Sequence, residues 1–232
     1  DNPRGYFDLL GHGGDGENYG IPMNTAQDLG GRLPATSEPK GPLNILGLGD
    51  SQAQGQGVRY EDTMYAKLSA KLLNSGQNMS VKNVAVSGYD LDQIVSRYAY
   101  EARDPGLYDW VVYAMVLDDF GLDRRQLQGH DLIQRQPVQT EDPWRLRSAT
   151  YNFFAHIAEQ WVLSEQTTEA YLASYRGAAL KQQEAQLQRL AEAVNVDGGR
   201  FLIVVLPLLY DFEHYPFGEI HSTIAKWGQD ND

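Results

Sequence analysis

The sequence predicts an α/β fold, a doubly wound parallel sheet in a three-layer α/β/α arrangement. Two observations carry this prediction. Apolar runs at 43–48, 81–86, 110–117 and 201–206 alternate with longer segments in which apolar residues recur at helical spacing. The run 110–117 is apolar at nearly every position, which is typical of a strand buried on both faces inside a parallel sheet.

The segments between these runs are predicted as helices, because each has one apolar face. The residues of these faces are Met64, Leu68 and Leu72 in the first helix, Leu91, Ile94, Val95 and Tyr98 in the second, and Leu180, Leu187, Leu190, Ala191 and Val194 in the longer of a pair between about 148 and 194. A last helix is expected at about 217–227. Right-handed crossovers between parallel strands would gather the carboxyl ends of all four strands at one edge of the sheet.

The chain is interpreted as one domain with two additions. Its length of 232 residues suits a single α/β domain. Residues 1–42 are rich in Gly, Asn, Asp and Pro without sustained periodicity, and we expect an extended arm or cap there. Residues 43–232 are expected to form the α/β domain, with a helical insertion at about 120–194.

Composition disfavours several classes of partner. The formal net charge of −12 would repel nucleic acid or an anionic membrane over most of the surface, so neutral or cationic small molecules fit better. The chain has no cysteine, which removes disulfides and cysteine nucleophiles but leaves the compartment open. An extracytoplasmic bacterial protein, periplasmic or secreted, is the interpretation that we favour. No apolar stretch reaches the roughly 18 residues that a membrane span needs.

A turn after the first apolar run is the most informative local feature. Gly49-Asp50-Ser51 follows the run directly, and Gly55 and Gly57 come soon after it. A strand that stops at such a turn and continues as a helix can expose a serine hydroxyl at the edge of a sheet. The same tripeptide is also typical of an ordinary capped helix start, so it does not decide the function alone.

Two further junctions belong to the same predicted edge. The second run ends at Ser87-Gly88-Tyr89, and the third ends at Asp118-Asp119. Because the carboxyl ends of parallel strands lie along one edge, we expect Ser51, Gly88 and Asp118 to face one crevice.

With these three blocks, the chain resembles the SGNH hydrolases, the GDSL-type esterases, from about 43 to about 227, and the resemblance implies their flavodoxin-like fold. It implies that Ser51 is the nucleophile and that the N–H groups of Ser51 and Gly88 bind the oxyanion. Asp118 stands where the family has an asparagine that donates to the same oxyanion. Asp50, Tyr89 and Asp119 are expected to contact the substrate.

The chain departs from the family pattern in two ways. An ionised Asp118 would donate no hydrogen bond and would repel an oxyanion, whereas a protonated Asp118 could still donate one. The family's Asp-x-x-His pair, which supplies the general base, does not occur after the fourth strand, so we expect the base and a fifth strand to lie outside this chain.

The remaining candidates are interpreted as structural. His214 and His221 have no aspartate three residues before them, and we expect both to be surface or packing residues. No metal site is expected, and neither is a cofactor. The resulting hypothesis is a serine esterase that acts on a carbohydrate O-acetyl ester or transfers the acetyl group. The alternatives are a non-catalytic glycan-binding or assembly module and a nucleotide binder, the latter disfavoured by the acidic Asp50 in the first loop.

Overall fold

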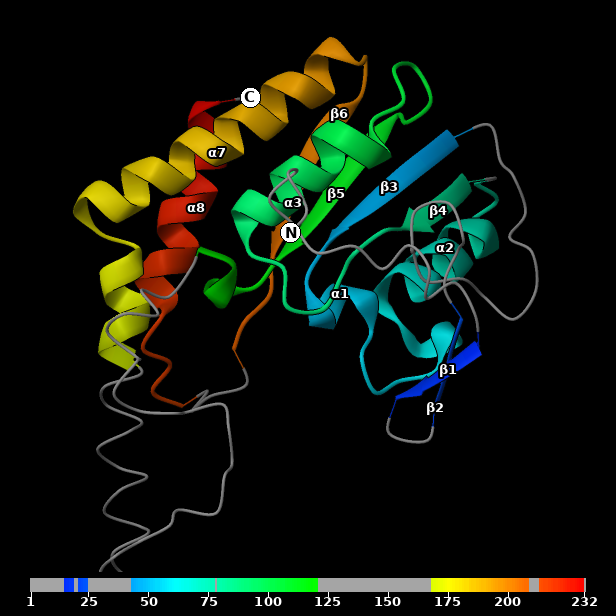
Figure 1. Ribbon diagram of the computed structural model, residues 1–232, viewed down its shortest axis with the longest axis horizontal. Coiled ribbons are helices and arrows are strands. Elements are labelled where there is room, and N and C mark those ends of the chain that lie inside the picture. Colours follow the sequence, from blue (N-terminus) through cyan, green and yellow to red (C-terminus); the bar gives the residue numbers. More distant parts are fainter. Residues whose placement is uncertain are drawn as a thin grey trace, which may run out of the picture.

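A four-stranded parallel sheet forms the centre of the computed structural model (Figure 1). The structure describes residues 15–18, 21–24, 43–77, 79–120, 168–208 and 213–231. The strands are β3 (Leu43–Gly49), β4 (Met79–Asn83), β5 (Trp110–Met115) and β6 (Arg200–Val205), in the order β4-β3-β5-β6. Every neighbouring pair is parallel, which confirms the predicted sheet.

Helices cover both faces of this sheet and complete a three-layer α/β/α fold (Figure 1). They are α1 (Ser51–Gln54), α2 (Met64–Asn74), α3 (Leu91–Arg97), α7 (Gly177–Val196) and α8 (Gly218–Asp230). Short turns of other helix types are η1 (Tyr60–Asp62), η2 (Tyr98–Ala102) and η3 (Leu117–Phe120). Helix α2 packs on one face, and α3 and α7 pack on the other, with α8 beside β6.

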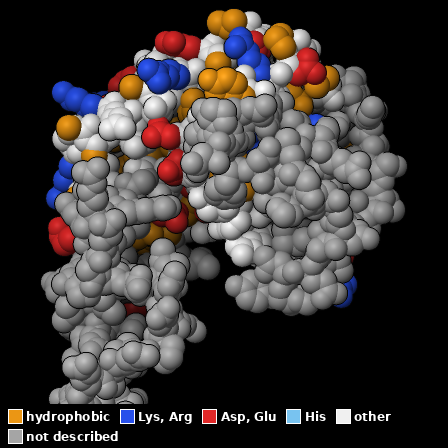
Figure 2. Space-filling view, viewed as in Figure 1, with side chains coloured by type: hydrophobic (Ala, Val, Ile, Leu, Met, Phe, Trp, Pro, Cys, Tyr) orange, Lys and Arg blue, Asp and Glu red, His pale blue; other side chains and the backbone are white. Residues whose placement is uncertain are grey.

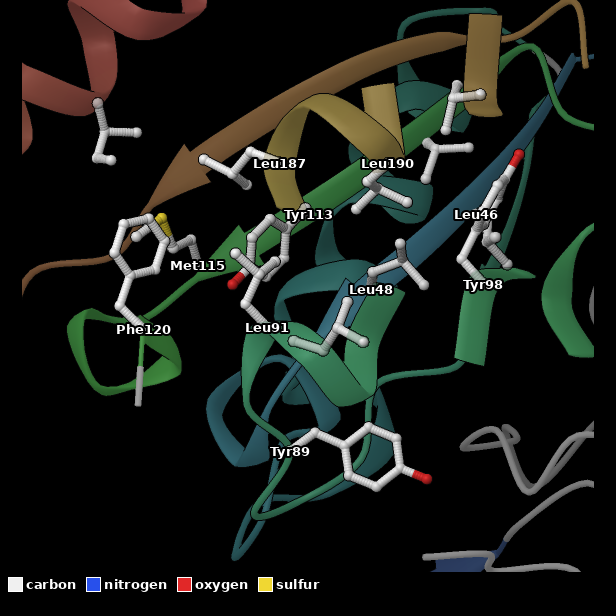
Figure 3. Packing of buried hydrophobic residues seen from close by; sticks show 14 of the residues in the cluster. Leu46, Leu48, Tyr89, Leu91, Tyr98, Tyr113, Met115, Phe120, Leu187 and Leu190 are labelled. Carbon is white, nitrogen blue, oxygen red and sulfur yellow. The ribbon is translucent and has the colours of Figure 1, made fainter. Parts of the chain in front are cut away.

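Each face of the sheet has its own apolar core. On the α3 and α7 face, alternate residues of β3 and β5 meet leucines from both helices (Figure 3). The fully buried members include Leu46, Leu48, Leu91, Tyr113, Met115, Leu187 and Leu190. On the other face, the hydroxyl of Tyr65 of α2 lies 2.7 Å from the carbonyl oxygen of Leu48 and 2.8 Å from that of Val112, and it can donate its proton to either. The ring of Tyr65 lies over Gly47, where a Cβ would be 2.6 Å from it.

Two predicted strands end earlier than the apolar runs that identified them. Strand β4 ends at Asn83, although the N–H groups of Val84 and Val86 still bond to β3 carbonyls. Asn83 accounts for the change, because its side chain accepts the N–H of Ala85 at 3.0 Å in place of a neighbouring strand. Strand β5 ends at Met115, and the chain then turns through η3.

The N-terminal segment contains an element that the sequence did not predict. Strands β1 (Asp15–Asn18) and β2 (Ile21–Asn24) form a two-stranded antiparallel sheet. The rest of this segment, and most of the predicted insertion before 168, lie outside the described residues. The boundaries that we predict for the arm and the insertion therefore stay predictions.

The strand order places a topological switch point between β3 and β5. From β3 the chain crosses outward to β4, and it then returns past β3 to β5 and β6 on the other side. In open α/β sheets, ligands bind outside the carboxyl ends of the strands at such a point. The segments after Gly49 and Met115, which are the last residues of these two strands, are therefore where a site is expected.

Part of one face of the described surface is visible in Figure 2. Where the described surface is visible in Figure 2, acidic and basic side chains are interspersed, and no basic patch gathers on that face. Within the described ranges, no helix combines the length and apolar character needed to cross a membrane.

Candidate active site

The first part of the site is the turn between β3 and α1, here called the serine turn (residues 49–55). Asp50 caps α1, because its Oδ1 accepts the N–H of Gln52 at 2.9 Å. Gly49 has φ of +145°, and a Cβ there would lie 2.5 Å from the Cβ of Ala53 and 2.7 Å from the carbonyl oxygen of Ala114. Only glycine allows this close approach, so the serine turn packs directly on β5.

The Ser51 hydroxyl is partly exposed at the start of α1. Its Oγ donates to Oδ2 of Asp50 at 3.2 Å. Within the part of the chain that the structure describes, Ser51 has no hydrogen bond to a histidine, and the backbone N–H groups of Ser51 and Gly88 donate to no other residue. These two N–H groups therefore remain as donors for a ligand.

The second part of the site is the loop between β4 and α3. Gly88 is exposed and has φ of +81°, in the left-handed region that favours glycine. Ser87, one residue earlier, is joined to the serine turn, because its N–H donates to Oε1 of Gln54 at 3.3 Å. The ring of Tyr89 lies in the core at 3% exposure (Figure 3), and the guanidinium of Arg97 is 5.9 Å from its centroid. A substrate contact by Tyr89 stays a prediction that the burial of its ring does not favour.

The third part of the site is η3, directly after β5. Asp118 is exposed, whereas Asp119 is 2% exposed. Oδ2 of Asp119 accepts the hydroxyl of Tyr113 at 2.8 Å and the N–H of Val116 at 2.9 Å. Its other oxygen, Oδ1, is buried and has no hydrogen-bond partner among the described residues. Asp119 therefore fixes the turn while half of its carboxyl group is left unsatisfied.

These turns bring three carboxyl groups together, and we call Asp50, Asp118 and Asp119 the carboxyl cluster. One oxygen from each lies within 4.8 Å of the others. Partial enclosure by the protein, together with the charge of Asp50, raises the pKa of Asp118. The pKa of Asp119 is raised well above its usual value by burial first and by Asp50 second. Asp118 and Asp119 therefore keep their protons to a higher pH than an ordinary aspartate does.

The sequence pointed to each member of the carboxyl cluster singly but not to the cluster. The available signal was that Asp50 and Asp118 follow adjacent strands, yet adjacency depends on the strand order, which the sequence did not supply. Three carboxylates at this separation are also the kind of oxygen ligands that a hard cation takes. No metal was expected from the sequence, and that expectation stays a prediction.

Two tyrosines from the segment before α7 lie near the carboxyl cluster. The hydroxyl of Tyr175 donates to the carbonyl of Leu117 at 3.0 Å, and its ring stacks on Phe120 at 4.5 Å between centroids. Burial, followed by the charge of Asp118, raises the pKa of Tyr171 to about 12. Sequence reasoning missed both residues, because nothing in their local pattern shows which strand end they will cover.

Of the two histidines in the C-terminal part, His221 has its hydrogen bond with Tyr215 instead of with this constellation. His221 lies in α8, and its Nε2 is 2.9 Å from the hydroxyl of Tyr215. That hydroxyl also accepts the N–H of Leu208 at 3.2 Å, and burial lowers the pKa of His221. A neutral His221 accepting from Tyr215 satisfies all these groups, in agreement with a packing role.

No family model and no curated protein matches this chain. Among solved structures, the chain is similar to TesA at 17% identity and a TM-score of 0.44, over 79% of this chain and 73% of TesA. It is also similar to AlinE4, an SGNH-hydrolase family esterase, at 15% identity and a TM-score of 0.34, over 83% of this chain and 98% of AlinE4. A third is LAE5, an alpha/beta hydrolase enzyme from the metagenome of Lake Arreo, Spain, at 14% identity and a TM-score of 0.32, over 70% and 77% of the two chains.

Proposed function

We propose that this chain is a serine ester hydrolase of the SGNH type, and that its substrate is an O-acetylated carbohydrate from which it removes or transfers the acetyl group. The observation that carries the proposal is the serine turn at the switch point of the sheet. Ser51 lies two residues after the end of a buried strand, its hydroxyl donates to Asp50 at 3.2 Å, and two backbone N–H groups nearby remain as donors.

In the proposed reaction, Oγ of Ser51 attacks the carbonyl carbon of the ester and gives up its proton to a general base. The N–H groups of Ser51 and Gly88 stabilise the oxyanion of the tetrahedral intermediate. The bond to the alcohol then breaks, the alcohol takes the proton, and an acetyl group remains on Ser51. Water, or a second hydroxyl in a transferase, accepts the acetyl group from it. The proposal takes its base from a histidine outside the described residues.

Asp118 makes this reaction dependent on pH. A protonated Asp118 can donate one hydrogen bond to the oxyanion, whereas its carboxylate donates none and repels the charge. Because its pKa is raised, the protonated form persists to higher pH than in an ordinary aspartate. We therefore expect the contribution of Asp118 to be present in acid and lost as the pH rises through that pKa.

The carbohydrate part of the proposal rests on the resemblance seen in the sequence. The net charge of −12 is compatible with a neutral sugar ester and disfavours a polyanionic one. A small chromogenic ester is consequently the right first probe, since it tests the chemistry without assuming the sugar.

The second candidate is a non-catalytic glycan-binding module on the same fold. Two observations favour it: Asp118 occupies the place of an expected donor, and within the described residues Ser51 is bonded to a carboxylate instead of a histidine. In that case the crevice would hold a glycan without turnover.

Hydrolysis of p-nitrophenyl acetate between pH 5 and 9 separates the two candidates, using the parent chain, Ser51→Ala and Asp118→Asn. The enzyme hypothesis expects Ser51→Ala to fall to the background rate. It expects Asp118→Asn to exceed the parent by on the order of tenfold or more at pH 8, since a lost oxyanion donor costs about 100-fold or more in kcat. It also expects the parent, but not Asp118→Asn, to lose activity as Asp118 ionises.

Background rates in all three proteins would contradict the enzyme hypothesis. Calorimetric titration with O-acetylated oligosaccharides would then test the binding module, for which the parent and the Ser51→Ala variant should bind them equally well. An unchanged rate in Asp118→Asn, alongside an inactive Ser51→Ala, would keep the esterase and remove Asp118 from the oxyanion site.

A further inference from the structure

Buried side-chain amides join the serine turn to the loop that carries Gly88. Gln54 is 4% exposed, and its Oε1 accepts the N–H of Ser87 at 3.3 Å. Asn83 is also 4% exposed; its Nδ2 donates to the carbonyl of Ala53 at 2.9 Å. The two segments that would supply the oxyanion donors are thus connected by hydrogen bonds from residues with no assigned role.

Gln54 binds the residue that precedes one of those donors, because its side chain accepts the N–H of Ser87 and the donor is the N–H of Gly88. The peptide between Ser87 and Gly88 carries the Gly88 N–H, and Gln54 fixes the N–H at the other end of Ser87. Gly88 has a left-handed φ of +81° and is exposed, and it has no side chain that could pack against the rest of the protein. The orientation of its N–H therefore depends on how firmly Ser87 is anchored.

Gln54 itself is well placed to act as that anchor. It is the last residue of α1, only three residues after Ser51, and its N–H donates to the carbonyl of Asp50 at 2.9 Å. Its backbone thus moves with the nucleophile, while its side chain holds the opposite loop. Gln54 thus links the segment of Ser51 to the backbone of the segment that carries Gly88.

We propose that Gln54 is a positioning residue that sets the separation and orientation of the Ser51 and Gly88 N–H groups. This inference rests on the proposed esterase function and adds a residue that acts through Ser87 without touching the substrate. Oxyanion stabilisation requires donors about 2.7 to 3.1 Å from the developing charge, so a small displacement of Gly88 weakens it. Substrate binding in the ground state does not depend on that donor.

The neighbouring Gln56 provides a matched control. It is exposed, and its Oε1 accepts the side-chain hydroxyl of Ser87 at 3.1 Å, so it contacts the same residue without holding its backbone N–H. Methionine replaces glutamine with nearly the same shape and no carbonyl acceptor. Gln54→Met therefore removes the acceptor of the Ser87 backbone N–H, whereas Gln56→Met removes the acceptor of the Ser87 hydroxyl.

The test measures kcat and KM for p-nitrophenyl acetate at pH 6 in the parent and both variants, with thermal melts and amide hydrogen exchange of Ser87 followed by NMR. For Gln54→Met we expect kcat to fall about tenfold or more, KM to stay within about twofold and exchange at Ser87 to accelerate. For Gln56→Met we expect kcat, KM and the amide exchange of Ser87 to match the parent. Gln54→Glu at pH 5 is a second variant, because a carboxyl group keeps an oxygen that can accept the N–H of Ser87 in either protonation state, and its kcat should stay near that of the parent.

The outcomes separate the inference from the function on which it rests. If the parent has Ser51-dependent activity and Gln54→Met equals Gln56→Met, the positioning role is wrong and the esterase stands. A rise in KM alone would also overturn the positioning role. If the parent shows no Ser51-dependent hydrolysis, the esterase proposal fails, and the positioning role falls with it. If Gln54→Met does not fold, a Gln54→Glu variant that folds and loses kcat at pH 5 overturns the inference, and one that keeps it supports it.

Discussion

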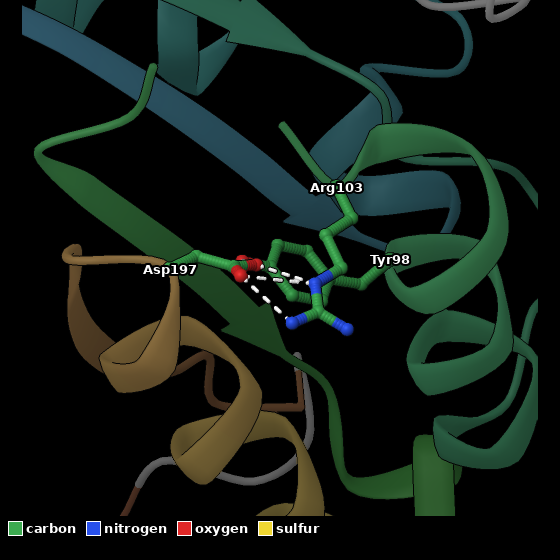
Figure 4. A network of polar contacts seen from close by, with 3 residues as sticks. All are labelled: Tyr98, Arg103 and Asp197. Carbon is green, nitrogen blue, oxygen red and sulfur yellow. Dashed lines mark hydrogen bonds and ion pairs between the residues drawn. The ribbon is translucent and has the colours of Figure 1, made fainter. Parts of the chain in front are cut away.

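Two buried aspartates at opposite edges of the same sheet have opposite environments. Asp197 lies before β6, at the edge where the strands begin, and it accepts from Arg103 at 2.8 Å and from the hydroxyl of Tyr98 at 3.0 Å (Figure 4). Asp119 lies at the edge where the strands end; it has one oxygen without a partner among the described residues and faces Asp50 and Asp118.

The pKa values follow these environments. The hydrogen bond from Arg103 lowers the pKa of Asp197, whereas burial and the charge of Asp50 raise the pKa of Asp119. At the first edge the buried charge of Asp197 is neutralised by Arg103. These contacts join the end of α7 to the segment after α3. At the second edge three carboxyl groups lie together without a described cation, and two of them have raised pKa values, which makes the group a candidate functional site. The contrast supports the proposal that the site lies at the carboxyl ends of the strands.

The largest expected effect concerns the glycines of the two edges. A Cβ at Gly49 would meet Ala53 and the carbonyl of Ala114, whereas a Cβ at Gly198, with φ of +86°, would meet nothing within 4 Å. We expect Gly49→Ala to lower the free energy of unfolding by about 3 kcal/mol or more, from steric overlap added to backbone strain. Gly198→Ala should cost about 1 to 2 kcal/mol, from strain alone. Urea unfolding measures both, and equal losses would refute the close packing of the serine turn.

A smaller effect of opposite sign is expected at Asp119. Because its pKa is raised in the folded state, its contribution to stability is present below the unfolded pKa and is lost as the pH rises through the folded pKa. We therefore expect Asp119→Asn to raise the free energy of unfolding at pH 8 by about 1 to 2 kcal/mol, and to have little effect near pH 4. Denaturant titrations at both pH values check this.

Asp197 is the matched control for that measurement. Its pKa is lowered in the folded state, so its contribution is present above the unfolded pKa and is lost as the pH falls through the folded pKa. Asp197→Asn should accordingly destabilise the chain at pH 8. If both variants change stability in the same direction at pH 8, the contrast between the two edges is wrong.

The smallest expected effect is the loss of one hydrogen bond in the neutralised network. Tyr98→Phe removes the hydroxyl that donates to Asp197, while Arg103 remains. We expect the free energy of unfolding to fall by about 1 kcal/mol, with no change in the kcat of the proposed ester hydrolysis. A change in kcat would show that the network around Asp197, where the strands begin, affects the site at the other end of the sheet.

Much of the fold was readable from local patterns. The apolar runs gave all four strands of the sheet, and the helical spacing of Leu187, Leu190 and Val194 gave the buried face of α7. The predicted ends of two strands were less accurate. After these strands the N–H groups of Ala85 and Val116 donate to side-chain oxygens instead of a neighbouring strand, and a propensity pattern does not show such bonds. The β1–β2 pair was missed, since four-residue strands carry almost no periodicity.

The sequence by itself determined the class of fold and the position of the serine turn, because period and turn chemistry are local properties of a chain. Only the tertiary structure decided which strand ends are neighbours. That choice placed Asp50 beside Asp118 and Asp119 and brought Gln54 to Ser87 across 33 positions. The raised pKa values and the links between the two turns are consequences of long-range packing, in which burial and like charges act between residues that no local pattern connects.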